Sequence, residues 1–258
     1  MGKTMIPPSN RLILSIVLSG AFILNTVAVC RSEVVVFDRV TTIQTPIRIQ
    51  VLTKGRFFAQ GGRLVDIYLD GIHLKKILTG GDGYGYLKYI PKSPGLKKIS
   101  ARSDVDSSSG RLLVMSATDK AIIIEVEGAF KDTIFSEEIR DNSQKAVDSL
   151  SKAYTIIYLT RYVGKGISRS WLDKEDFPES VILRWQGPGT INALENKGVS
   201  IHAVIGSAAV ISTVEKNIEN RYTFEKSKDG KTVKDWDEIL KLLLPAAPAV
   251  APEEQKAQ

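Results

Sequence analysis

The pattern of apolar residues changes near residue 120, and this change indicates a chain built from two different domains. Before it, short runs of alternating apolar and polar residues, such as 47–51, 64–69 and 84–89, are separated by Gly, Pro, Asp and Ser clusters. Runs of this length and spacing predict an all-β sandwich over 34–120. After it, apolar strand-like runs alternate with helical stretches, which predicts a three-layer α/β domain with a parallel sheet over 121–244.

The first 30 residues have the layout of an export signal or membrane anchor. A short basic segment precedes 12–29, which is apolar and carries no charge. Cys30 stands where a lipoprotein signal places its acylated cysteine, although Val29 precedes it where Gly, Ala or Ser is usual. Three interpretations are open: lipidation at Cys30, an uncleaved anchor, and simple cleavage near Ala28. All three predict export to the periplasm or cell surface, and the first two also attach the protein to a membrane.

The chemistry available to the chain is limited by its composition. Cys30 is the single cysteine, which excludes an internal disulfide and a cysteine-based zinc site. Only two histidines are present, so a histidine metal centre is not expected, and no metal site is predicted. The last segment, 245–258, is rich in Ala and Pro and predicts a flexible tail without a site.

The strand-rich part resembles a bacterial immunoglobulin-like domain. The likeness rests on the aromatic run 83–86, the Pro-Gly turn and strand of 94–101, and the small-residue stretch 109–112. In such domains an aromatic strand, a Pro-Gly turn and a strand ending in small residues precede the last hairpin. The resemblance implies an immunoglobulin-like sandwich and covers about eighty residues.

The second part resembles a haloacid-dehalogenase-type phosphatase of the lipin-type and actin-patch phosphatidate phosphatase branch. An apolar strand leads into Glu125-Val126-Glu127-Gly128, where the family has Asp-x-Asp-Gly. A second strand ends in Thr160-Arg161, which matches the family's strand ending in Ser or Thr. Two further segments, 171–183 and 203–207, match the branch's Trp-Leu region and its last motif. The resemblance implies a Rossmann-like fold with its site at the carboxyl ends of parallel strands.

The resemblance also implies a set of site residues, and several of them depart from the family pattern. In that family the first aspartate is the nucleophile, the second is the general acid and base, and magnesium offsets the phosphate charge. Here glutamates occupy both positions, at Glu125 and Glu127, and Ser207 replaces the first acidic residue of the last motif. The expected phosphate or anion ligands are Thr160, Arg161, Lys197 and Ser207.

These departures predict a protein without catalytic activity. An extra methylene at each carboxylate displaces it by about an ångström, which can cost on the order of a hundredfold in rate. The sequence therefore predicts an exported, membrane-tethered binding or interaction protein built on a degenerate phosphatase-like domain, with no cofactor. The alternative is a weak or atypical magnesium-dependent phosphatase acting on a phosphate monoester such as phosphatidate.

Charge is distributed unevenly between the two parts. Residues 34–120 hold 14 Lys and Arg against 7 Asp and Glu, whereas 121–258 hold 18 against 21. A basic sandwich near a membrane is suited to anionic lipid, to a cell-surface component, or to another envelope protein. Nucleic acid is not an expected partner, because no basic run is interleaved with aromatic residues.

Overall fold

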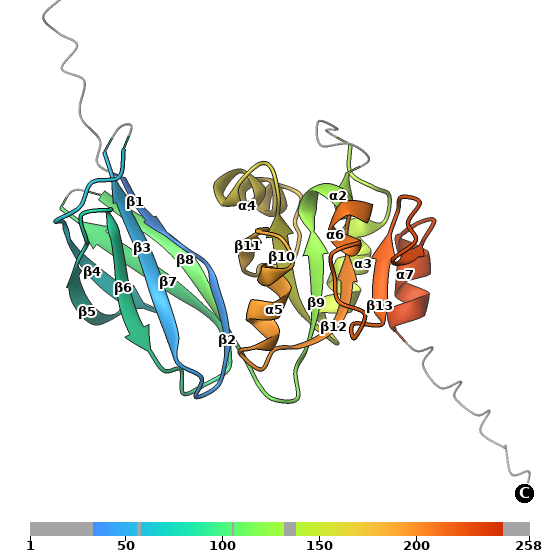
Figure 1. The fold of residues 1–258 in the computed structure, drawn as a ribbon, viewed down its shortest axis with the longest axis horizontal. Helices are drawn as coiled ribbons and strands as arrows, with labels where there is room; N and C mark the ends of the chain where they lie inside the picture. The colour runs from blue at the N-terminus through green and yellow to red at the C-terminus, as the bar shows by residue number, and fades with distance from the viewer. Residues whose placement is uncertain (1–32, 56–57, 105, 132–137, 245–258) are drawn as a thin grey trace, which may run out of the picture.

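The computed structural model describes residues 33–55, 58–104, 106–131 and 138–244. The predicted export segment, Cys30 and the predicted tail over 245–258 lie outside these residues. Within the described ranges, no helix is both long and apolar enough to cross a bilayer. Figure 1 shows β1–β8 gathered in one lobe and β9 to α7 in the other.

The first lobe consists of two sheets packed face to face, which confirms the predicted β-sandwich. One sheet has the strand order β1-β3-β6, with the strands Glu33–Val36, Ile47–Lys54 and Tyr84–Tyr89. The other has the order β2-β8-β7-β4-β5, with the strands Arg39–Thr42, Asp106–Met115, Gly95–Ser103, Leu64–Leu69 and Ile72–Leu78. Their inward side chains form one apolar core, because alternate residues of a strand point to the same face.

The second lobe is built on a six-stranded sheet in which each neighbouring pair is parallel. The strand order is β11-β10-β9-β12-β13-β14, with the strands Ile182–Arg184, Thr155–Thr160, Lys120–Glu125, Ser200–Ile205, Asn220–Thr223 and Lys231–Thr232. Its helices are α2 Val126–Phe130, α3 Ser143–Ser151, α4 Lys165–Lys174, α5 Gly189–Glu195, α6 Ala208–Ile211 and α7 Trp236–Leu243.

Helices cover both faces of this sheet, so the lobe has three layers. Ile122 and Ile124 of β9 pack with α3 and α7, whereas Ile123 between them packs with α5 and α6. A strand buried on both faces needs an unbroken apolar sequence, and this explains the isoleucine run of β9.

The two lobes share part of one apolar core. Val40 of β2 and both Leu113 and Met115 of β8 belong to the cluster that lies between the sheet and α5. The chain turns between Met115 and Lys120 to pass from the sandwich into β9. The junction is therefore packed and buries apolar side chains of both lobes.

Candidate functional site

Three adjacent strands bring most of the predicted site residues to one edge of the parallel sheet. Strand β9 ends at Glu125, β10 ends at Thr160, and β12 ends at Ile205, two residues before Ser207. Because these strands are neighbours and parallel, their carboxyl ends meet. Glu127 follows in the first turn of α2 and is buried.

The Glu127 carboxylate is held by the turn that follows β10. Its Oε1 accepts hydrogen bonds from the Thr160 hydroxyl at 2.8 Å and from the backbone N–H of Arg161 at 3.0 Å. The N–H groups of Tyr162 and Val163 donate to the same oxygen at 3.0 and 3.2 Å. We call these four donors, from residues 160–163, the anion turn.

The anion turn is a receptor for a negative charge, and a side chain of this chain occupies it. Successive backbone N–H groups that converge on one point form an anion-binding concavity. Ser168 adds to the network by donating to the Thr160 hydroxyl at 3.0 Å. A phosphate group bound at the same place would need the donors that Glu127 already uses.

The Glu125 carboxylate points to the last motif instead. Its Oε2 accepts from the N–H and the hydroxyl of Ser207, at 2.7 and 2.6 Å. Burial raises the pKa of Glu125, and the two Ser207 hydrogen bonds partly offset this effect. Gly128 and Gly206 permit the close approach, since a Cβ at either would lie within 3 Å of Glu125 Oε2.

Arg161 contributes to the site mainly through its backbone. Its N–H belongs to the anion turn, whereas its guanidinium lies 4.8 Å from the ring centroid of Tyr162. The side chain is near enough to lower the pKa of Glu125, but less than burial, Ser207 and Glu127 affect it.

Lys197 lies away from the other predicted site residues. It precedes the start of β12, so about six strand residues, roughly 20 Å, separate it from the carboxyl edge of the sheet. Its Nζ donates to the carbonyl of Val40 at 3.3 Å, and its own carbonyl accepts from the Thr42 hydroxyl. Burial lowers its pKa. The structure therefore places Lys197 apart from the other predicted ligands, at the contact between the two lobes.

The site does not fit a magnesium ion. Among the described residues, no group of three or more His, Cys, Asp or Glu side chains is placed to hold a metal. The two carboxylates of the site are each committed to other donors, on different strands.

The cavity beside Glu127 and Trp171 has a volume of only about 60 Å³, far below the few hundred Å³ typical of ligand pockets.

A second polar centre, at the junction of the lobes, has no counterpart in the sequence predictions. Asp38 is fully buried, and its Oδ1 accepts from the N–H of Arg111 and from Lys165 Nζ. Its Oδ2 accepts from Arg169 and from the N–H of Ile182. The signal that could have indicated it is a lone carboxylate directly after the apolar run 34–37.

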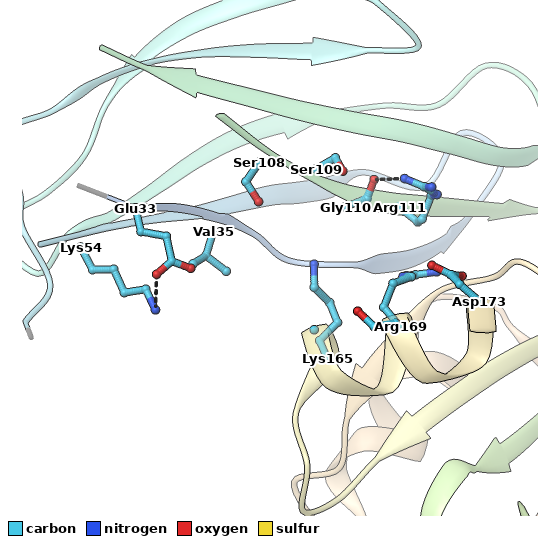
Figure 2. A pocket seen from close by; sticks show the side chains of 12 residues that line it. Glu33, Val35, Lys54, Ser108, Ser109, Gly110, Arg111, Lys165, Arg169 and Asp173 are labelled. Atoms are coloured by element: carbon cyan, nitrogen blue, oxygen red, sulfur yellow. Dashed lines mark hydrogen bonds and ion pairs between the residues drawn. The ribbon is translucent and has the colours of Figure 1, made fainter. Parts of the chain in front are cut away.

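A groove of about 620 Å³ opens beside this centre. Figure 2 shows Lys165, Arg169 and Asp173 of helix α4 on one wall and Glu33, Lys54 and Arg111 of the sandwich on the other. Its cations are engaged: Lys54 pairs with Glu33, Arg111 with Glu179, and both α4 cations with Asp38.

Comparison with known proteins gives structural similarity only. No protein-family model matches the chain, and no curated protein matches it significantly. The CARDB domain of a Pyrococcus furiosus protein is 17% identical over 32% of this chain and 89% of that chain, with a TM-score of 0.25. An IG27 domain is 15% identical over 33% and 95%, with a TM-score of 0.28. Fibronectin(III)-like modules of Clostridium thermocellum CbhA are 15% identical over 32% and 97%, with a TM-score of 0.24. These TM-scores are low and the matches cover about a third of the chain. The description of the β-sandwich therefore rests on its two sheets alone.

Proposed function

We propose that this chain is an exported, membrane-tethered binding or interaction protein without catalytic activity. On this proposal, the sandwich is immunoglobulin-like and the α/β domain is a degenerate relative of the haloacid-dehalogenase-type phosphatases. The resemblance of the sequence motifs supports the relationship. So does the position of Glu125 and Thr160 at the ends of neighbouring strands, with Glu127 two residues after the first.

The observation that carries the proposal is the occupation of the anion turn by Glu127. Four donors meet one carboxylate oxygen, so the chain itself satisfies the groups that would hold a phosphate. An incoming phosphate dianion would have to displace this carboxylate and would also meet Glu125 nearby. Two carboxylates repel such a group, and the nearby Arg161 guanidinium is the weakest of the influences on Glu125. Phosphoryl transfer needs the opposite arrangement, with metal ions and donors around the phosphate.

The absence of activity is tested with the purified protein, magnesium, and two substrates, p-nitrophenyl phosphate and phosphatidate. We expect no turnover by the wild type and at most partial activity in the Glu125→Asp/Glu127→Asp/Ser207→Asp variant. Magnesium-dependent turnover by the wild type that Glu125→Ala abolishes would overturn the proposal and would make Glu125 the nucleophile.

Export is tested separately by cell fractionation of the wild type and Cys30→Ala. We expect the wild type in the membrane fraction, and release of Cys30→Ala if lipidation is the attachment. Recovery of the wild type in the cytosol with residues 1–29 retained would refute export.

A further inference from the structure

The side of the three-stranded sheet that faces away from the sandwich core carries aromatic rings next to polar and cationic side chains. Val34, Val36, Ile49 and Val51 point into the core from β1 and β3. The alternate positions point outward and are exposed or half-buried. Glu33, Val35 and Lys54 are outward at one end of this sheet, where Lys54 pairs with Glu33. We call the remaining outward residues the outer face: Phe37, Arg48, Gln50, Leu52, Tyr84, Tyr86 and Lys88.

Three aromatic rings of the outer face follow one another. Phe37 and Tyr84 have ring centroids 6.2 Å apart, and Tyr84 and Tyr86 have centroids 6.4 Å apart. The ring planes differ by 30° and 17°, so the rings are nearly parallel. Tyr86 is 51% exposed. Tyr84 and Tyr86 stand on β6, and the N–H of Phe37, just after β1, donates to the carbonyl of Gln50 on β3. The rings therefore form a rigid platform that needs little ordering on contact with a ligand.

Hydrogen-bonding groups lie directly beside the rings. Gln50 is the cross-strand neighbour of Tyr86, and its amide oxygen accepts from Arg39. The Arg39 guanidinium lies 5.8 Å from the centroid of Phe37. The platform therefore combines flat apolar faces with an amide and a guanidinium.

Two cations face each other at one end of this platform. Arg48 and Lys88 are direct partners in the antiparallel register of β3 and β6, and both are exposed. Like charges directly opposite on neighbouring strands destabilise a sheet. Among the residues that the structure describes, neither cation has an ion-pair or hydrogen-bond partner. An anionic group placed between them would remove this repulsion.

We propose that the outer face binds an acidic polysaccharide. The exposed ring of Tyr86, supported by Tyr84 and Phe37 behind it, accepts the flat apolar face of a sugar, and Arg48 with Lys88 binds an acidic substituent. The cation pair is followed on the same face by the Gln50 and Tyr86 pair, roughly 7 Å further along the strands. Adjacent positions of the face can therefore bind a charged substituent and a stacked sugar of the same polysaccharide. This site goes beyond the proposed function, because it lies on the sandwich and does not use the anion turn.

The chemistry of the face favours a polysaccharide over a lipid surface. Membrane contact calls for protruding apolar side chains, whereas this face presents tyrosine hydroxyls, an amide and partly covered rings. The net positive charge of residues 34–120 adds attraction for an acidic polymer of any kind.

The test measures binding of the full-length protein in detergent to immobilised polygalacturonate, with dextran as the neutral polymer. We expect binding to polygalacturonate that weakens with salt, and no binding to dextran. Tyr86→Ala should weaken binding roughly three- to tenfold, whereas Tyr86→Phe, which keeps the ring, should bind nearly as the wild type does. Arg48→Gln/Lys88→Gln should abolish most of the salt-dependent binding.

A matched control removes two positive charges elsewhere on the sandwich. Lys75→Gln/Lys98→Gln changes exposed residues of the other sheet and should bind like the wild type. Arg48→Gln/Lys88→Gln should melt no lower than the wild type, which shows that it folds. Equal weakening by both double variants, or no effect of Tyr86→Ala, would overturn the proposal. The proposal would also be overturned if the same residues bound anionic vesicles or single-stranded DNA while the protein did not bind polygalacturonate.

Discussion

The ammonium nitrogen of Lys165 lies 3.2 Å from Oδ1 of Asp38, and Lys165 follows the last residue of the anion turn by two positions. Glu127 holds the anion turn from the sheet side, and Asp38 holds the start of α4 from the sandwich side. Two buried carboxylates from different lobes therefore fix one short stretch of chain. The position of the sandwich and the closed state of the anion turn are expected to depend on each other.

Removal of the Asp38 carboxylate should destabilise the junction. Asp38→Ala leaves Lys165 and Arg169 without their shared anion, and loss of one partner from a buried charge cluster costs about 3–5 kcal/mol. Urea denaturation measures this loss, and hydrogen exchange should show faster opening of α4. The exposed Asp173→Asn on the same helix serves as the control and should change little. Equal stability of Asp38→Ala and the wild type would show that the cluster does not hold the lobes together.

Truncation of Glu127 should open the anion turn to external anions. Glu127→Ala leaves four donors without an acceptor, and we expect a loss of about 1–3 kcal/mol of unfolding free energy. Sulfate or phosphate should then raise the melting temperature of Glu127→Ala more than that of the wild type at the same concentration. The comparison with the wild type is needed because these salts stabilise proteins generally. Glu127→Gln, which keeps an acceptor, should respond less, and an identical response of all three proteins would contradict the closed site.

The raised pKa of Glu125 gives a pH dependence with a defined sign. Because burial raises the pKa in the folded state, the folded protein binds this proton more tightly than the unfolded chain does. The contribution of Glu125 to stability therefore falls as pH rises from the ordinary carboxyl pKa of 4.5 through the raised one. Glu125→Gln should be more stable than the wild type at pH 7, and the difference should shrink below about pH 4. The exposed Glu219→Gln should show no such trend. A difference that grows on acidification would contradict this assignment.

The shared core predicts that the lobes stabilise each other. Val40, Leu113 and Met115 lose their packing partners when the chain is divided near residue 118. We expect fragments 33–117 and 118–244 to melt below the intact chain in calorimetry, and mixing them should restore part of the loss. Fragments that melt at the temperature of the intact protein would show two independent domains.

Much of the fold follows from local sequence. The isoleucine run of β9 predicts a strand buried on both faces, and the structure places it in the middle of the parallel sheet. The short alternating runs of the sandwich predict strands in the same way, because a side-chain period of two is set by backbone geometry alone. The strands β13 and β14 escaped prediction, since they are short and carry little apolar sequence.

The sequence by itself determined that carboxylates and a hydroxyl stand at neighbouring strand ends, because strand endings are visible as the limits of apolar runs. Only the tertiary structure decided what those groups bind. Glu127 reaches the anion turn, about 35 residues further along the chain, because its side chain is one methylene longer than aspartate and the turn follows the neighbouring strand β10. Lys197 and Asp38 each bind groups of the opposite lobe that are more than 120 residues distant. Such partners depend on how the two lobes pack, and no local pattern encodes that packing.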